Sequence, residues 1–292
     1  MTHDLDAADA DTQHLERSAV ALFDELPGRS ALAAYRIAPD RAQARSLTAR
    51  RQDDQDEEPD AASSGGRVAV RPEDVFPAAS LAKIPVAVEV FRRISIGQFA
   101  PDERFDTSAE PRVGGGGLLD YFNPASELTL RELVLLMLAV SDNTAANFLL
   151  DLVGMGEVNE TMSRMHFERT RMARRFMDMQ ARAARRDNVT TANDMAELLL
   201  HIYHGTVAGA RDLRELLAVQ HLGEDIQHWL PESATLAHKT GTLEGIFHNA
   251  GIISGPHGNC AYCVLTAEQE DMPAARYAVG RVVRLLWDAW CA

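Results

Sequence analysis

The order of strand-like and helix-like hydrophobic patterns is the feature that most constrains the fold of this chain. Strand-like segments cover residues 31–37 and 67–71 near one end of the chain. Three more, with alternating apolar and polar residues, cover residues 235–242, 246–254 and 260–266. The long stretch between the two groups has a helical period. This order predicts an α+β fold, in which the terminal segments build an antiparallel sheet and the middle builds a helical unit.

Amphipathic helices are predicted at both ends of the chain, where they would cover the sheet. The first spans residues 13–26 and stops at Pro27-Gly28, and the last opens at Pro273. With a chain of 292 residues, one large globular domain or two intertwined ones can bury an ample core.

The same patterns predict the domain boundaries. Residues 13–75 and 222–292 are expected to form a discontinuous sheet domain, and residues 76–221 an all-helical domain. Residues 40–66 are rich in Asp, Glu, Ser and Gly and separate two predicted strands. Because such a composition buries little apolar surface, we expect a mobile insertion there.

Local signals divide the helical middle. Thr129 and Glu132 match a capping box, and the run after them is apolar all round, which predicts a buried central helix that ends at Ser141. Residues 101–123 are predicted to be a loop, with four consecutive glycines at 114–117. A phosphate-binding loop would need Gly-x-x-x-x-Gly-Lys-Ser/Thr, which is absent, so turn chemistry is the favoured interpretation.

Charge composition argues against several classes of partner. The net charge is −14, with 43 acidic residues, so non-specific binding to nucleic acid or to an anionic membrane is not expected. No apolar stretch is long enough to span a bilayer. The N-terminus lacks the basic and apolar regions of a secretory signal, so we expect a cytoplasmic protein, or a periplasmic or secreted one if a leader has been lost. We also expect a monomer.

Cysteine and histidine give no sign of a metal or redox site. Cys260 and Cys263 lie within an alternating apolar run without a second pair, so strand packing is the better interpretation. The three cysteines do not form a disulfide framework. His238 and His248 lack ligand spacing and are expected to pack in strands or to lie at the surface. We predict no metal and no cofactor.

A serine followed one helical turn later by a lysine marks a candidate nucleophile and base. Ser80 and Lys83 lie three residues apart, so a helix would place both on one face. The chain has 29 Lys+Arg but only two lysines, Lys83 and Lys239. Arginine cannot lose its proton in a protein, whereas a desolvated lysine can. Codon bias could also explain the arginines, and alone Ser80 could be a helix cap and Lys83 a surface charge.

Three short motifs follow one another in a fixed order. They are Ser80-x-x-Lys83, Ser141-Asp-Asn143 and Lys239-Thr-Gly241, expected at a helix start, at a helix end and on a strand. Each alone is weak, but together they form the signature of class A β-lactamases and penicillin-binding proteins. The chain resembles this serine β-lactamase superfamily, closest to its class A branch, over roughly residues 13–290. The resemblance implies a β-lactamase/DD-peptidase-like fold.

The chemistry of these side chains can be stated from the residues themselves. A serine is a poor nucleophile until a base takes its proton, and Lys83 is placed to be that base. Lys239 could lower the pKa of Lys83 by repulsion and could also bind a substrate carboxylate. Ser141 can relay a proton to a leaving nitrogen, and Asn143 can hydrogen-bond both Lys83 and a substrate amide. A helix that starts at Ser80 leaves its backbone N–H free for an oxyanion.

The resemblance implies the remaining parts of the site. It makes the backbone N–H of Thr242 the second oxyanion donor, and it gives the hydroxyls of Thr240 and Thr242 a part in carboxylate recognition. The implied activity is β-lactam hydrolysis through an acyl-enzyme on Ser80. The alternatives are a D-Ala-D-Ala peptidase or esterase on the same scaffold, or a covalent β-lactam binder that does not turn over.

One segment departs from the class A pattern. Class A β-lactamases resemble one another in a Glu-x-x-Leu-Asn segment that positions the hydrolytic water, and this segment is absent here. An ungapped match from Thr170 places Phe176 at the glutamate. Asp178 and Glu168 are the candidate replacement bases, although Asp178 could instead pair structurally with Arg169, Arg174 or Arg186. Acylation is therefore expected, while efficient deacylation is in doubt.

Overall fold

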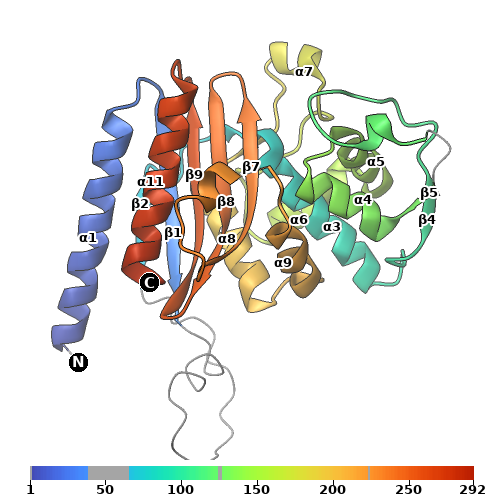
Figure 1. Ribbon diagram of the computed structural model, residues 1–292. Coiled ribbons are helices and arrows are strands. Elements are labelled where there is room, and N and C mark those ends of the chain that lie inside the picture. Colours follow the sequence, from blue (N-terminus) through green and yellow to red (C-terminus); the bar gives the residue numbers. More distant parts are fainter. Residues whose placement is uncertain (1, 39–65, 124–126, 223) are drawn as a thin grey trace, which may run out of the picture.

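The computed structural model describes residues 2–38, 66–123, 127–222 and 224–292, with side chains described from residue 12 onwards except at residues 224 and 225. The predicted insertion at residues 40–66 lies outside this range, apart from Gly66. Within the described residues the chain forms one central sheet with helices on both faces (Figure 1). The predicted division into a discontinuous sheet domain and a helical domain stays a prediction.

The sheet confirms the predicted α+β class. Its strands are β1 (Arg29–Ile37), β2 (Arg67–Val70), β7 (Thr235–Leu243), β8 (Ile246–Gly255) and β9 (Gly258–Ala267). They pair antiparallel in the order β2-β1-β9-β8-β7. The N-terminal and C-terminal segments therefore build the sheet together, and β7 is an edge strand.

Two helices from the ends of the chain cover one face of the sheet, as predicted. These are α1 (Thr2–Asp24) and α11 (Met272–Trp290), which lie side by side in Figure 1. Helix α1 begins earlier than residue 13, the predicted start. Alanine has the highest helix propensity, and no Pro or Gly interrupts residues 2–12, so the helix extends beyond the segment with apolar periodicity.

The opposite face of the sheet packs against the helical part of the chain. Helix α8 (Ala192–His204) contacts β1, β8 and β9. The other described helices are α3 (Lys83–Ser95), α4 (Leu130–Ala139), α5 (Asn143–Val153), α6 (Met155–Arg164), α7 (Met179–Ala183), α9 (Ala210–Ala218) and α10 (Glu224–Gln227), with 3-10 turns η1 (Ala79–Ala82) and η2 (Leu119–Tyr121).

Local capping explains where several of these helices begin and end. The Thr129 side chain and Glu132 form the predicted capping box at the start of α4. Thr191 accepts a hydrogen bond from the Asp194 N–H at the start of α8, and Gly205 ends that helix in a left-handed conformation. These boundaries were predictable because each depends on residues that are close in sequence.

The prediction of a loop at residues 101–123 was wrong in part. It contains η2 and strand β4 (Arg104–Asp106), which pairs with β5 (Glu127–Thr129). A second short pair joins β3 (Phe76–Pro77) to β6 (Val189–Thr190). Two- and three-residue strands have no recognisable period, and the partner of β3 is remote in sequence, so local pattern could not predict them.

Cysteines and hydropathy add two further findings. Cys260 and Cys263 are buried on β9, in separate hydrophobic clusters, as the prediction of strand packing requires. No helix among the described residues is long and apolar enough to cross a bilayer.

Candidate active site

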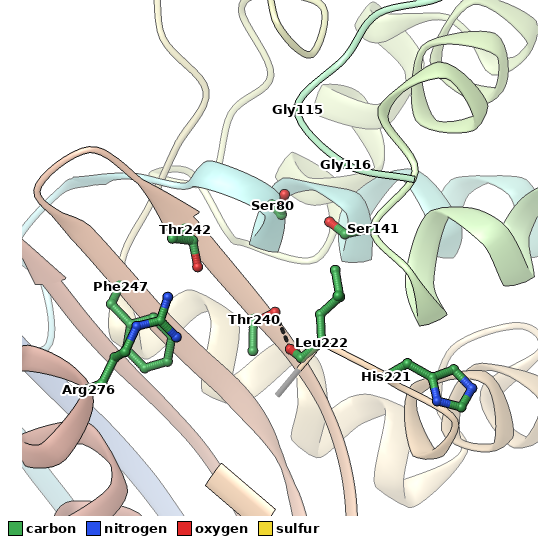
Figure 2. Close-up of a pocket in the computed structure, with 10 residues that line it drawn as sticks. All are labelled: Ser80, Gly115, Gly116, Ser141, His221, Leu222, Thr240, Thr242, Phe247 and Arg276. Carbon is green, nitrogen blue, oxygen red and sulfur yellow. Dashed lines mark hydrogen bonds between the residues drawn. The ribbon is translucent and has the colours of Figure 1, made fainter. Parts of the chain in front are cut away.

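A cavity of about 400 Å³ opens between the sheet edge and the helical part of the chain. Figure 2 shows Ser80 and Ser141 close together, with Thr240 and Thr242 on the adjacent strand and Arg276 stacked on Phe247 beyond them. The described lining residues are Ser80, Gly115, Gly116, Ser141, His221, Leu222, Thr240, Thr242, Phe247 and Arg276. Three segments that are distant in sequence thus bring their polar groups to one space.

Ser80 lies on a tight turn before an α-helix rather than at the helix start itself. It belongs to η1, and α3 begins at Lys83. The predicted start of the α-helix at Ser80 is therefore wrong by one turn. The chain enters α3 through the 3-10 turn η1, in which Ala79 has a positive φ of 47°. The turn keeps Ser80 and Lys83 on the same side, with Lys83 Nζ 3.4 Å from Ser80 Oγ.

Lys83 is the centre of the predicted constellation. Its side chain is fully buried. Besides Ser80 Oγ, Nζ lies 2.7 Å from the Ser141 carbonyl oxygen, 2.9 Å from Ser141 Oγ and 2.8 Å from Asn143 Oδ1. The structure thus brings together the two serines, Lys83 and Asn143, which the sequence placed in two separate motifs.

These partners determine the directions in which the N–H groups and the lone pair of an uncharged Lys83 amine would point. The Ser141 carbonyl and Asn143 Oδ1 can only accept hydrogen bonds, so each requires an N–H of Lys83. A neutral amine has two N–H groups and one lone pair. With both N–H groups used, the lone pair is left for a serine hydroxyl, and Ser80 and Ser141 are the two hydroxyls within reach. The arrangement therefore suits an amine that accepts a proton.

The loop around Ser141 is held by the two residues that follow it. Ser141 has a positive φ of 55°, a conformation uncommon for residues other than glycine. Asp142 caps α5 through the Ala145 N–H. Its other oxygen accepts hydrogen bonds from backbone N–H groups just after the glycine run, at 2.7 and 2.8 Å. A Cβ at Gly117 would lie 2.3 Å from Asp142 Oδ2, so the run provides close approach here.

Asn143 is oriented by the same glycine-containing segment. Its Nδ2 donates to the Gly114 carbonyl at 3.0 Å, which leaves Oδ1 facing Lys83. Gly115 and Gly116 thus line the cavity and Gly114 orients Asn143, in agreement with the turn chemistry that the sequence favoured.

Strand β7 brings the third motif to the cavity. Lys239 is fully buried, and its Nζ donates to the Thr240 carbonyl at 3.0 Å. Gly241 packs against the turn that carries Ser80, because a Cβ there would lie 3.3 Å from the Ala79 Cβ. A larger residue would push the strand away from the nucleophile. The glycine of the motif is thus explained by close packing between β7 and η1.

Burial changes the proton affinity of both lysines. Burial chiefly, and repulsion from Lys239 next, hold the pKa of Lys83 well below its usual value, while the Asp142 carboxylate acts in the opposite direction. Burial lowers the pKa of Lys239 to about 7. The lowered pKa favours the uncharged form of Lys83 that base catalysis requires, while Lys239 carries its charge below about pH 7.

Both histidines next to the third motif are buried, as strand packing predicts. Asn249 Nδ2 lies 2.9 Å from His238 Nδ1, and His248 Nε2 lies 2.8 Å from the Pro77 carbonyl oxygen. Burial lowers the pKa of each to about 4. His248 therefore connects β8 to the segment before Ser80. Among the described residues, no group of three or more His, Cys, Asp or Glu side chains could hold a metal ion.

The far side of the cavity contains groups that sequence reasoning missed. The Arg276 guanidinium carbon lies 4.4 Å from the centroid of the Phe247 ring, and both residues line the cavity. Thr240 Oγ1 donates to the Leu222 carbonyl at 2.8 Å. Arg276 belongs to a helix predicted only to cover the sheet, and it is one of many arginines, so nothing in the sequence distinguished it.

Comparison with known proteins places this site in a family. The model of the beta-lactamase enzyme family matches residues 60–290. This chain belongs to the β-lactamase enzyme family. The match covers all three motifs, so the resemblance inferred from them is confirmed.

Individual relatives agree with the family. A β-lactamase from Sphaerobacter thermophilus has 26% identity and a TM-score of 0.79, covering 94% of this chain and 96% of that chain. A leucine-to-glutamate variant of PBP-A, solved as an acyl-enzyme complex with penicillin G, has 24% identity and a TM-score of 0.79, covering 95% and 96%. The β-lactamase regulatory protein BlaB of Streptomyces cacaoi is 25% identical over 279 residues, covering 77% of this chain and 89% of BlaB.

The loop that departs from the class A pattern places an aromatic ring against Lys83 in the candidate site. The Asn147 side chain accepts from the Phe176 N–H at 2.7 Å and donates to the Phe176 carbonyl at 3.1 Å. The buried Phe176 ring has its centroid 5.0 Å from Lys83 Nζ. An apolar group therefore lies against the base, at the residue where the sequence match expected the glutamate.

The two candidate replacement carboxylates have other partners. Asp178 is exposed and accepts a hydrogen bond from the Ala181 N–H, as the cap of α7. Glu168 is exposed and accepts from Ser163 Oγ at 3.0 Å. Neither is among the described residues that line the cavity.

Two of the three arginines predicted as ion-pair partners of Asp178 pair with other carboxylates, and Arg169 pairs with Glu73 at 2.9 Å. Arg174 Nε pairs with Asp187 at 2.7 Å, and Arg182 also reaches Asp187 at 3.3 Å. Several carboxylates lie close to these arginines in the sequence, and only the path of the loop decides which carboxylate each arginine contacts.

Proposed function

We propose that this chain is a serine hydrolase that opens β-lactam rings by acylation of Ser80. The observation that carries the proposal is the set of contacts around a buried Lys83, with both serine hydroxyls and two obligatory acceptors within 3.4 Å. Family membership and the β-lactamase fold support the same reaction class.

In the first step Ser80 Oγ attacks the lactam carbonyl carbon while Lys83 Nζ takes the hydroxyl proton. Burial holds the pKa of Lys83 well below its usual value, which favours the uncharged amine that can take this proton. The negative charge that develops on the carbonyl oxygen would be bound by the backbone N–H groups of Ser80 and Thr242, as the family pattern implies.

In the second step the ring C–N bond breaks. Charged Lys83 returns a proton to Ser141 Oγ, 2.9 Å away, as Ser141 gives its own proton to the leaving nitrogen. The products of this half-reaction are an ester on Ser80, a free amine within the opened ligand, and an uncharged Lys83. Each proton that leaves Ser80 thus reaches the nitrogen, so the step balances without an external acid.

An anionic small molecule suits the remaining walls of the cavity. Thr242 offers a hydroxyl and Arg276 a fixed positive charge, and the buried Lys239 beside Thr240 adds a second positive charge below its pKa of about 7. Penicillins and cephalosporins carry a carboxylate next to the ring nitrogen, so this side of the cavity would bind that group.

A second candidate function, a covalent β-lactam binder with slow turnover, is favoured by Phe176. Hydrolysis of the Ser80 ester needs a water molecule and a base to activate it. The ring packed on Lys83 supplies neither, and the two nearby loop carboxylates have other partners. The similarity to a protein named as a β-lactamase regulator is compatible with a binding role.

Time-resolved intact-protein mass spectrometry with benzylpenicillin tests the proposal. We expect one added penicillin per chain in the wild type and none in Ser80→Ala. Fast return to the unmodified mass would indicate a β-lactamase, whereas an adduct that lasts for hours would indicate the slow binder. If Ser80→Ala is labelled as well as the wild type, the proposed function is wrong.

A chromogenic cephalosporin and a simple thioester complete the comparison. Release of the chromophore in a burst equal to the enzyme concentration, followed by a slow steady rate, is the pattern of rapid acylation and slow deacylation. Fast thioester cleavage without any β-lactam labelling would favour the peptidase or esterase alternative.

A further inference from the structure

Gln220 occupies a junction that no sequence motif marks. It lies between α9 and α10, and its side-chain amide is placed between the C-terminal end of α4 and strand β7. The next residue continues the connection, because the His221 N–H donates to the Ala139 carbonyl at 2.9 Å. One short segment thus joins the helix that leads to Ser141 with the strand that carries Lys239.

Hydrogen bonding decides which way the Gln220 amide faces. Its nitrogen donates to the carbonyls of Leu138 at 2.9 Å and Ala139 at 2.6 Å. Its oxygen then accepts from Lys239 Nζ at 3.1 Å and from the Thr240 N–H at 3.2 Å. The reverse orientation would set the amide oxygen against two carbonyl oxygens and its nitrogen against the Lys239 ammonium.

We propose that Gln220 is a positioning residue that holds the Lys239 ammonium and locks β7 onto the end of α4 without adding charge. The amide can do both because it has donors on one side and an acceptor on the other. Neither a carboxylate nor an alkyl side chain of the same length can meet both requirements at this position.

The absence of charge on Gln220 matters because the lysine pair is electrostatically coupled. Lys239 on β7 repels Lys83, which belongs to α3, and it also repels the adjoining His238 on its own strand. The charge of Lys239 therefore lowers the pKa of Lys83 and of His238. Asp142 is the carboxylate that acts on Lys83 in the opposite sense. An additional carboxylate beside Lys239 would offset its positive charge and raise the pKa of Lys83, so the charged form of the base would be favoured.

The titration of each lysine can be measured directly, because the chain contains only two lysines. Lysine labelled with ¹³C at Cε gives two side-chain NMR signals, which Lys83→Arg and Lys239→Arg assign. We expect Gln220→Glu to raise the titration midpoint of Lys239 by about 1 pH unit or more. Gln220→Met, which removes the acceptor without adding charge, should lower it.

Gln227→Glu is the matched control, because it adds the same charge at an exposed residue of α10. It should leave both lysine titrations within about 0.3 pH unit of the wild type, as expected for a screened surface charge. If the two Gln220 variants leave the Lys239 midpoint unchanged, or shift it in the same direction, the proposal is overturned.

The role of Gln220 in catalysis rests on the proposed function and has its own readout. The second-order rate constant of Ser80 acylation should fall about 10-fold in both Gln220 variants, as expected for lost positioning. In Gln220→Glu, the acidic limb of the pH profile of this rate constant should move to higher pH. A purely structural defect would not cause that shift. Because the lysine titration needs no substrate, failure of β-lactam labelling in the wild type would refute the proposed function and leave the test of Gln220 intact.

Discussion

Two neighbouring regions of the site differ in what they can contribute to a two-step reaction. Around Lys83, polar side chains are buried and hydrogen-bonded to one another. On the loop at residues 169–187, the apolar ring of Phe176 lies against Lys83, Asp178 caps a helix and Asp187 forms an ion pair. The comparison indicates that forming an acyl-enzyme and hydrolysing it depend on separate structural parts.

The two regions also use positive charge differently. The loop arginines pair with carboxylates, as Arg174 does with Asp187 and Arg169 with Glu73 at 2.9 Å. The two lysines are buried and form no ion pair with a carboxylate of the described residues, and burial lowers their pKa values. Arginine keeps its proton and suits the structural pairs, while lysine can lose it and suits catalysis. The rarity of lysine in this chain thus has a chemical counterpart in the structure.

Lys83→Arg should cause the largest change, a loss of acylation. The substitution keeps a positive charge but removes the base, so the acylation rate constant should fall by at least about 100-fold. Stopped-flow measurement with a chromogenic cephalosporin gives the rate. A thermal melt within a few degrees of the wild type would show that the variant is folded. Acylation at the wild-type rate would mean that Lys83 is not the base.

Phe176→Glu should have the next largest effect, now on deacylation. The two hydrogen bonds from Asn147 hold the backbone of residue 176, so a glutamate there would bring a carboxylate towards Ser80. We expect the acyl-enzyme to decay about 10- to 100-fold faster, the lower range for a general base. The decay of the penicillin adduct by mass spectrometry measures this change.

Phe176→Gln is the matched control for that experiment, because it has the same polarity and size as glutamate without the charge. It should leave adduct lifetime close to that of the wild type. Equal acceleration by glutamine and glutamate would show that removing the ring, rather than adding a base, admits the water.

The pH dependence of acylation should distinguish the roles of Lys83 and Lys239. Lys83 must be uncharged, so the rate constant should rise with pH through its lowered pKa, by up to about 10-fold per pH unit on that limb. Lys239 loses its charge above about pH 7, so binding of an anionic substrate should weaken from there upwards. A profile that keeps rising to the usual pKa of lysine would contradict a desolvated base.

Asp178→Ala should have the smallest effect. As the cap of α7, Asp178 should contribute about 1 kcal/mol to the free energy of unfolding. Its removal should leave the lifetime of the Ser80 adduct unchanged, because its cap oxygen faces the Ala181 N–H. Urea unfolding and adduct decay measure the two quantities. A lifetime several-fold longer would instead identify Asp178 as the deacylation base.

Local signals explain how much of this molecule could be predicted. The capping box at Thr129, the start of α8 at Thr191 and the three motifs all depend on residues a few positions apart. The apolar replacement at Phe176 was also visible from a short match. Helix ends, strand periods and motif spacing are local properties, so one sequence is enough to identify them.

The amino-acid sequence by itself determined the α+β class, the three motifs and the choice of lysine at two positions. The tertiary structure alone decided that Arg276 faces the same cavity as Ser80, and that Gln220 joins α4 to β7. It also decided that Asp187, rather than Asp178, pairs with Arg174. The physical reason is that proximity between residues far apart in the chain depends on how sheet and helices pack together, which no local pattern records.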